Sequence, residues 1–353
     1  MFEAKKIWRY IALIAVLGVA SYYGNNIKQM FNTKDADEHD LIKQYLLNDS
    51  PLYGFNKPKI WIHTKYEINA RKWRDFYSRN TYDLNQPYIH LTIKSIINHC
   101  SNDFHICLID DDTFSKLIPT WDIDLMNVAE PLKSQYRQLG LAQLIYYYGG
   151  MVVPNSFLCC RNLKDMYDEG INEHKPFVCE SINRTLNIQN QVNGSKMLFI
   201  PDTYFMGAEK NNQVILEYVE YLKKRSQSGH ITRVYEFLGD TQLGCIGSIN
   251  TGKMNLIGGE YIGIKTNKRK PVLIEDLMED NYLDLNTNIY GIYIPEEEIL
   301  LRPKYEWFAV LNSQQLLETN MFISKHIKAS MVDAFTDYDN YRISSEIKSV
   351  ISI

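Results

Sequence analysis

A segment that changes from helical to strand-like pattern at two glycines most constrains the fold of this chain. Leu132 to Tyr148 carries apolar residues at helical spacing, and Gly149-Gly150 ends this pattern. Met151 to Val153 then has the composition of a strand. Upstream, the run Lys59 to His63 predicts a first strand and Phe104 to Ile109 a second. Strands that alternate with helices of 10 to 17 residues predict an α/β fold with a mostly parallel sheet flanked by helices.

The same reasoning extends along the rest of the chain. Further helices are predicted at about Tyr88 to Cys100 and Asn212 to Lys224, and further strands at Phe177 to Glu180, Met197 to Ile200 and Thr203 to Met206. Beyond Gly229 the pattern is less regular, with expected strands near Tyr261 to Lys265 and Ile289 to Ile294 and an expected helix over Phe308 to Ile327. We therefore expect a core over 57–228 and a C-terminal extension, 229–353, packed on that core.

Composition limits the classes of function. The 353 residues are 45% hydrophobic and 23% charged, as in globular domains. The net charge of −4 offers no basic field to a phosphate backbone, so no nucleic-acid partner is expected. The six cysteines include no Cys-x-x-Cys pair, which argues against structural zinc. We interpret them as small buried side chains, and Cys100 with Cys107 is the first pair to test for a disulfide.

The N-terminal segment is predicted to be a membrane anchor. Ile7 to Tyr23 is mostly apolar and, at a helical rise of about 1.5 Å per residue, spans about 25 Å. Lys5, Lys6 and Arg9 favour a cytoplasmic N-terminus and a lumenal or external main domain, in the Golgi or endoplasmic reticulum or on a viral membrane. Residues 1–24 are thus expected to form a cytoplasmic tail and single-pass signal anchor, and residues 25–56 a stem.

Two other interpretations of this segment stay open. Val19-Ala20-Ser21 has the small residues of a cleavage site, as in a removed signal peptide. A buried core helix is the third interpretation, although such a helix needs no basic residues ahead of it. The glycosylation triplets at Asn48, Asn183 and Asn193 are compatible with exposure outside the cytoplasm.

The segment Leu144 to Leu163 (LIYYYGGMVVPNSFLCCRNL) resembles the core of the capsular-polysaccharide-synthesis family and of related DxD-motif sugar transferases. In that family a helix ends in Tyr-Gly-Gly, and the next strand delivers an Asp-x-Asp. Pro58 to His63 (PKIWIH) is similar to the family's opening strand, and Phe205 to Leu222 to its strand-to-helix unit. The resemblance covers about Pro58 to Arg225. It implies a GT-A-like (Rossmann-like) fold with a nucleotide sugar and a glycan as ligands.

The resemblance also implies a metal site that this sequence does not reproduce. In such a site Mn²⁺ or Mg²⁺ neutralises the diphosphate leaving group, held by hard carboxylate oxygens. Aligned on the two glycines, Pro154 and Ser156 replace the two aspartates, while Gln138 and Leu141 replace an Asp and an Arg of the upstream helix. No catalytic residue is assigned. The predicted donor-binding residues are His63, Gly149, Gly150, Asn155 and Ser156.

Two arrangements would compensate for the missing acids. Asp110 and Asp112 follow a predicted strand and are the candidates for a non-standard metal site, although a turn that caps the next helix is the stronger interpretation. Mn²⁺ or Mg²⁺ is expected only if such a site exists. The second arrangement is metal-free neutralisation by nearby basic residues, for which ordinary surface charge is the preferred alternative. These basic residues are Lys133, Arg137 and Arg161.

Two functions follow from these observations. The first is a membrane-anchored glycosyltransferase-like protein with reduced or absent metal-dependent sugar transfer. The alternative is a non-catalytic glycan-binding or structural membrane protein that uses the transferase fold as a scaffold. A viral envelope is one setting for this second function. The many Tyr, Asn, Ile and Lys residues have AT-rich codons and indicate an AT-rich genome, such as that of a protist or of a large DNA virus. Whether the protein is an enzyme is left open by the sequence. Glu180 and Asp240 are the weaker candidates for an acceptor-side general base, because each is a lone acid without a partner motif.

Overall fold

The computed structural model describes residues 57–65, 68–69, 81–84, 86–119, 121–182, 198–227 and 234–332. All of them belong to Tyr45–Ile353, one of the two compact units into which the chain divides. The predicted anchor, the stem and the three glycosylation triplets lie outside the described residues. Within the described ranges, no helix combines the length and the apolar character that a bilayer span requires.

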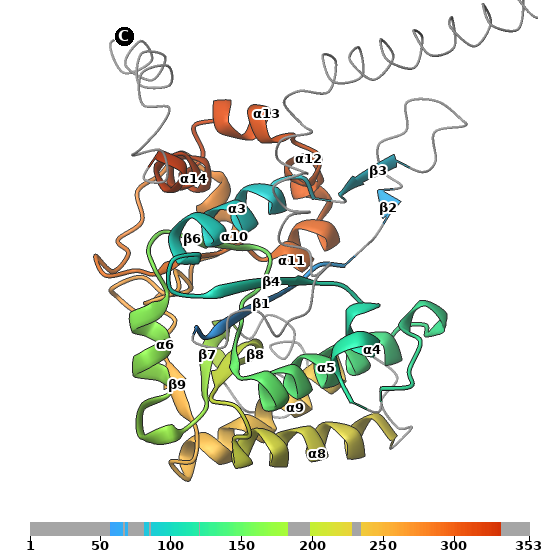
Figure 1. The fold of residues 1–353 in the computed structure, drawn as a ribbon. Coiled ribbons are helices and arrows are strands. Elements are labelled where there is room, and N and C mark those ends of the chain that lie inside the picture. Colours follow the sequence, from blue (N-terminus) through green and yellow to red (C-terminus); the bar gives the residue numbers. More distant parts are fainter. Residues whose placement is uncertain are drawn as a thin grey trace, which may run out of the picture. The chain divides into compact units, whose positions relative to one another are not determined.

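A six-stranded mixed sheet, mostly parallel, forms the centre of the described unit (Figure 1). Its strand order is β4-β1-β5-β8-β7-β9, and β8 alone runs antiparallel to both of its neighbours. The strands are β1 Lys59–His63, β4 His105–Ile109, β5 Gly150–Val152, β7 Phe177–Ile182, β8 Phe199–Ala208 and β9 Asn255–Ile257. The prediction of an α/β fold with a mostly parallel sheet is therefore confirmed.

Helices cover both faces of this sheet (Figure 1). On one face α5 (Leu132–Tyr148) packs against α8 (Gln213–Gln227) and α9 (Val234–Asn250). On the other face lie α3 (Ile89–Cys100) and α14 (Phe322–Val332), which contact each other. The remaining α-helices are α4 Thr113–Leu117, α6 Lys164–Gly170, α10 Ile274–Met278, α11 Glu296–Leu301, α12 Glu306–Ala309 and α13 Ser313–Glu318.

Two small antiparallel sheets complete the described part of the fold. One pairs β6 (Phe157–Cys159) with β10 (Gly291–Tyr293), and the other pairs β2 (Ile68–Asn69) with β3 (Thr81–Leu84). β10 thereby connects the C-terminal region to the segment that follows β5. Short 3₁₀ turns occur at Leu125–Asn127, Asn172–His174 and Pro303–Tyr305.

Burial explains why β1 lies in the interior of the sheet. Ile60, Trp61 and Ile62 have no exposed surface, as expected for a parallel strand that is covered on both faces. The Trp61 indole donates a hydrogen bond to the Gly149 carbonyl oxygen over 3.0 Å, so its one polar atom is also satisfied. This bond ties β1 to the end of α5, whose bounds are those predicted from the sequence.

The two glycines between α5 and β5 are required by backbone geometry. Gly149 has φ +70° and Gly150 has φ +92°, both in the left-handed region. A Cβ atom added at Gly150 would lie 2.2 Å from the Lys59 carbonyl oxygen. This close approach allows β5 to pair with β1 directly after the helix ends, which sets the position of the residues that follow β5.

Three local predictions were wrong. The two strands expected over Met197 to Met206 form the single strand β8. The strand expected near Tyr261 does not form; the strand of this region is β9, earlier in the chain, where residues 255–257 pair with β7. The long helix expected from Phe308 is divided into α12, α13 and α14. Asn312 begins a new helix there, because its side chain and that of Gln315 cap each other's backbone N–H groups.

A pair of alanine substitutions tests the requirement at Gly150. Gly150→Ala should lower the free energy of unfolding by about 3 kcal/mol or more, because it combines a left-handed φ with a backbone clash. Gly252→Ala is the matched control: Gly252 has φ +70°, but its added Cβ would meet nothing within 4 Å, so only about 1 kcal/mol should be lost. Urea denaturation of the full-length variants measures both. Equal losses would contradict the assigned role of the close approach.

Candidate functional site

A cavity of about 460 Å³ opens where the parallel strands end. His63 ends β1, residues 153–156 follow β5, and Ser181 and Ile182 end β7, and all of them line this cavity. α11 closes the opposite side with Glu296, Glu297 and Glu298. The carboxyl edge of a parallel sheet is where α/β proteins bind ligands, so this cavity is the candidate functional site.

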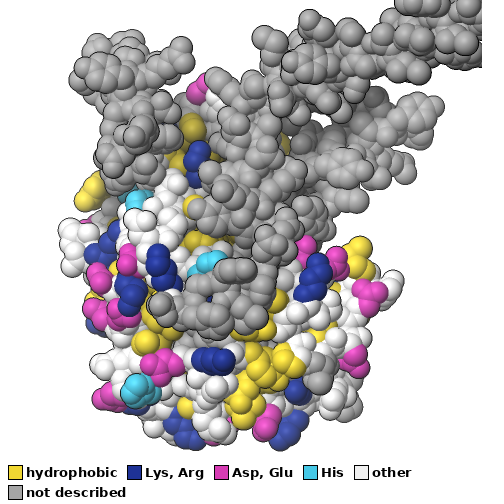
Figure 2. All heavy atoms as spheres, in the orientation of Figure 1, with side chains coloured by type: hydrophobic (Ala, Val, Ile, Leu, Met, Phe, Trp, Pro, Cys, Tyr) yellow, Lys and Arg dark blue, Asp and Glu magenta, His cyan; other side chains and the backbone are white. Residues whose placement is uncertain are grey.

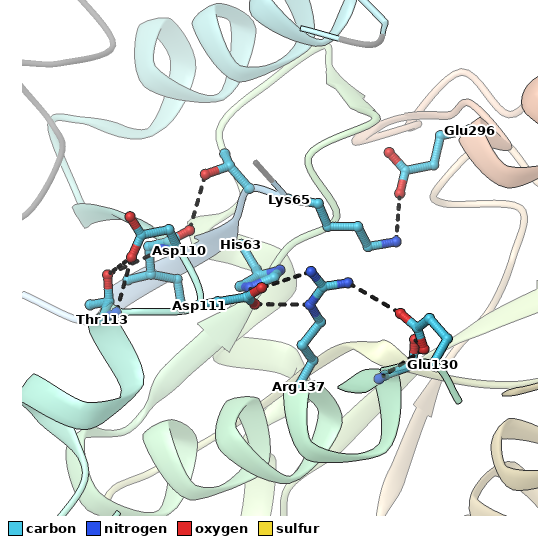
Figure 3. A network of polar contacts seen from close by, with 11 residues as sticks. His63, Lys65, Asp110, Asp111, Thr113, Glu130, Arg137 and Glu296 are labelled. Atoms are coloured by element: carbon cyan, nitrogen blue, oxygen red, sulfur yellow. Dashed lines mark hydrogen bonds and ion pairs between the residues drawn. The ribbon is translucent and has the colours of Figure 1, made fainter. Parts of the chain in front are cut away.

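A charge network lies beside the cavity, and two of its members, His63 and Arg137, line it (Figure 3). Arg137, on α5, is 6% exposed and donates two hydrogen bonds to Asp111, with Nε–Oδ1 and Nη2–Oδ2 distances of 2.8 and 2.7 Å. His63 Nε2 lies 3.0 Å from the same carboxylate. Glu130 Oε1 lies 3.6 Å from the other side of the guanidinium. The ends of β1 and β4 and the first turns of α5 are therefore linked through one carboxylate.

The network fixes the charge of its members. Burial acts to raise the pKa of Asp111, but the hydrogen bonds from His63 and Arg137 outweigh it and hold that pKa well below its ordinary value. Burial lowers the pKa of His63, and Asp111 opposes this effect only in part. Asp111 is therefore an anion and His63 a neutral ring at pH 7. Because the carboxylate can only accept, Nε2 of the neutral ring carries the hydrogen.

The other two cations of the cavity are also paired. Lys65 Nζ lies 3.6 Å from Glu296 Oε1 and 3.9 Å from Glu297 Oε1. Burial acts to lower the pKa of Lys65, but these two carboxylates outweigh it and raise the pKa well above the ordinary value. Arg302 pairs with Glu275 and Glu298.

On the outer face shown in Figure 2, basic and acidic side chains of the described residues are interspersed.

The segment after β5 presents neutral groups to the cavity. Pro154, Asn155 and Ser156 all line it. Ser156 is 1% exposed, and its hydroxyl has no hydrogen-bond partner among the described residues. The Asn155 carbonyl accepts a hydrogen bond from Thr92 Oγ1 over 2.5 Å, which fixes the backbone of this cavity-lining residue.

Strand β8 carries an irregularity at the same place. Its Asp202 pairs with Cys179 of β7 and its Met206 with the preceding Val178, so Thr203, Tyr204 and Phe205 have no counterparts on β7. Bulges of this kind redirect side chains and are enriched beside active sites. Here the bulge places Asp202 and Tyr204 in the cavity wall.

Asp202 is the buried acid of this cavity that lacks a cationic partner within the described residues. It is 6% exposed and accepts a hydrogen bond over 2.9 Å from the Tyr204 backbone N–H. Burial raises the pKa of Asp202 to about 6; the Tyr204 hydrogen bond opposes the rise, and the charge of Glu297 adds to it. At neutral pH the group is mostly ionised at a cost in stability, which is typical of residues retained for function.

The residues present do not fit a divalent metal of the expected kind. Pro154 has no ligand atom, and Asn155 and Ser156 offer only neutral oxygens. Asp110 Oδ1 accepts hydrogen bonds from the Thr113 N–H and hydroxyl, over 2.9 and 2.6 Å, so it is engaged in the turn that precedes α4. Asp112 is exposed. In the described parts of the chain, no three His, Cys, Asp or Glu side chains converge as a metal site.

The structure brings together some of the residues singled out in the sequence. His63, Asn155 and Ser156 line the cavity, whereas Gly149 and Gly150 do not and serve the backbone turn. The preferred interpretation of Arg137 as surface charge was wrong, because Arg137 is buried against Asp111. Arg161 instead stacks on the Tyr290 ring at 3.8 Å, and neither it nor Lys133 lines the cavity.

Other candidates lie away from the cavity or outside the described side chains. Glu180 pairs with Lys265 and accepts a hydrogen bond from the Gly259 N–H, whereas the Asp240 side chain is outside the described part. The Cys100 thiol lies 3.8 Å from that of Cys159, and the Cys107 thiol lies against the His105 carbonyl oxygen. All six cysteines are free, and five of them are buried, as interpreted from the sequence.

Lys65 and Asp202 were missed in the sequence. Lys65 follows the end of the first strand by two residues. Residues just after a parallel strand lie at the ligand-binding edge of the sheet, so its position in the sequence could have identified it as a candidate. Asp202 lies near the start of an antiparallel strand, so its location at the same edge depends on strand direction. No local pattern reveals that direction.

Comparisons with solved structures give distant likenesses, two of which are described here. No family model matches the chain, and no curated protein matches its sequence. It is similar to the galactosyltransferase LgtC in complex with donor and acceptor sugar analogues, with a TM-score of 0.37 and 10% identity over 80% of this chain and 99% of that chain. It is also similar to the PaToxG glycosyltransferase, with a TM-score of 0.32 and 11% identity over 56% and 72% of the two chains. Likenesses at these TM-scores do not identify the activity.

Replacing Asp202 by Asn tests its electrostatic state. The folded pKa of about 6 exceeds the ordinary 3.8, so ionisation of Asp202 destabilises the fold increasingly as pH rises from 4 through 6. Asp202→Asn should therefore raise the free energy of unfolding by about 1–3 kcal/mol at pH 8 and by much less at pH 4.5. Urea denaturation at both pH values measures the difference. A gain that does not depend on pH, or a loss at pH 8, would contradict the assignment.

Proposed function

We propose that this protein is glycosyltransferase-like and binds carbohydrate in the cavity at the carboxyl edge of its sheet, without metal-dependent sugar transfer. The observation that carries the proposal is the segment after β5. It occupies the cavity wall, where the resembled family has two aspartates, and presents Pro154, Asn155 and Ser156. Amide and hydroxyl groups suit the hydroxyls of a sugar better than they suit a divalent cation.

The nearby acids do not restore the missing function. Asp111 is held by Arg137 and His63, and Asp110 is held by Thr113. Glu296 and Glu297 flank the ammonium group of Lys65, so a cation already lies between them. A metal ion placed there would have to displace Lys65, and the like charges would repel.

Metal-free sugar transfer is the second candidate. It is favoured by one observation: Lys65 and Arg137 both line the cavity, and each carries a positive charge that would contact a diphosphate. Both side chains are engaged by carboxylates in the present arrangement, so a donor would have to compete with Glu296 for Lys65 and with Asp111 for Arg137.

Calorimetric titration distinguishes these functions. The full-length protein is titrated with UDP-glucose, UDP-galactose, UDP-N-acetylglucosamine and GDP-mannose, in Mn²⁺ and in EDTA, and is applied to an array of immobilised glycans. We expect glycan binding that is the same in both buffers, and no Mn²⁺-dependent binding of any donor, because the carboxylate ligands are absent. Donor binding in EDTA would support the second candidate.

A variant that restores the acids provides the control. Pro154→Asp combined with Ser156→Asp supplies two carboxylates at the expected positions, and Mn²⁺ alone should then bind to the variant and not to the wild type. Mn²⁺-dependent donor binding by the wild type would overturn the proposal, and so would failure to bind any glycan.

We propose in addition that Ile7 to Tyr23 anchors the chain, with its N-terminus in the cytoplasm and the main domain lumenal or external. The apolar stretch, the preceding basic residues and the aromatic residues at both ends support this proposal. The protein expressed in microsomes should resist carbonate extraction, its main domain should be protected from added protease, and Val16→Arg with Leu17→Arg should abolish both effects. A mature N-terminus near Ser21 would instead establish a cleaved signal peptide.

A further inference from the structure

Three polar residues that line the cavity have side chains with no structural role assigned so far. They are the amide of Asn155, the hydroxyl of Ser156 and the carboxylate of Asp202. Among the described residues the Ser156 hydroxyl has no partner, and Asp202 is engaged only by the Tyr204 backbone N–H. A buried hydroxyl without a partner costs about 1–3 kcal/mol, so the group is better explained by a ligand than by stability.

The register of the sheet places these groups near one another. β5 and β8 are antiparallel, and their last pair at the cavity end is Val152 with Met206. Beyond this pair, Ser156 lies four residues after Val152, and Asp202 lies four residues before Met206. Both segments therefore extend from the pair in the same direction. Both residues are at least nine-tenths buried and line the same cavity. The bulge at residues 203–205 turns this part of β8 toward the cavity and away from regular pairing with β7.

The charges around this position exclude one class of ligand. Each cation that lines the cavity is engaged by carboxylates: Lys65 by Glu296 and Glu297, Arg137 by Asp111 and Glu130, and Arg302 by Glu275 and Glu298. Asp202 has no such counter-charge within the described residues, and Glu297 adds to its negative field. An anionic group next to Asp202 would be repelled, whereas a hydroxyl would donate a hydrogen bond to it.

We propose that Asn155, Ser156 and Asp202 form a subsite for the hydroxyl groups of an uncharged sugar ring, which rejects sugars that carry a carboxylate. The subsite rests on the carbohydrate-binding function proposed above. Asp202 accepts a hydrogen bond from one sugar hydroxyl, and Ser156 and Asn155 bind neighbouring hydroxyls. The carboxylate thus supplies both the strongest contact and the discrimination against acidic sugars.

Saturation-transfer NMR on the full-length protein tests the subsite with matched pairs of sugars. The probes are glucose with glucuronic acid, galactose with galacturonic acid, and mannose and N-acetylglucosamine as further neutral sugars. We expect a neutral sugar to bind and its acidic counterpart to bind at least about tenfold more weakly. Asp202→Asn should weaken the neutral sugar by about tenfold or more and also reduce the discrimination against the acid, an effect that a purely structural role would not produce.

Further variants separate the possible outcomes. Ser156→Ala should weaken the neutral sugar by about two- to tenfold, whereas Asp112→Asn and Ser115→Ala, at exposed positions outside the cavity, should change nothing. Ser156→Ala tests the subsite independently of any change in charge at Asp202. Sugar binding that is indifferent to both cavity variants, or equal binding of the acidic sugars, would overturn the subsite alone. Absence of binding by every sugar here and by every glycan on the array would overturn the function as well.

Discussion

The buried pairing of Arg137 with Asp111 is the interaction on which the site depends. It joins α5 to the end of β4, and the shared contact with His63 extends the link to β1. Removing one partner of a buried pair leaves an uncompensated charge at a cost of about 3–5 kcal/mol, so the three elements are fixed relative to one another. The same pairing occupies Arg137 and Asp111, which would otherwise be the obvious cation and anion for a ligand. Ligand contacts in the cavity are therefore expected from other residues.

Those other residues come from two irregular positions beside regular strands. The glycine turn after α5 lets β5 start directly against β1, which sets residues 154–156 at the cavity. The bulge in β8 brings Asp202 to the same cavity from the neighbouring strand. A neutral amide residue, a serine and an aspartate thus line the same cavity, a combination suited to hydroxyl groups. It contrasts with the paired carboxylates that a divalent cation requires.

Local pattern was sufficient for much of the core. α5 and β1 have the bounds expected from periodicity, because both are long or buried enough for their apolar pattern to be unambiguous. The C-terminal region was predicted less well. Its helices are short and are begun by capping residues such as Asn312, while β9 is three residues long and depends on β7 for its existence as a strand. Interactions between distant segments decide such elements, and windows of local sequence do not contain them.

By itself the sequence determined the alternation of strands and helices, the glycine turn, and the absence of aspartates at the positions of Pro154 and Ser156. Each of these is a property of neighbouring residues. Only the tertiary structure decided that Arg137 is buried against Asp111, that Lys65 lies between Glu296 and Glu297, and that Asp202 shares a cavity with Ser156. The physical reason is that burial and Coulomb interactions depend on separation in space and not on separation along the chain. The partners in these contacts are separated by as many as 232 positions along the chain, between Lys65 and Glu297.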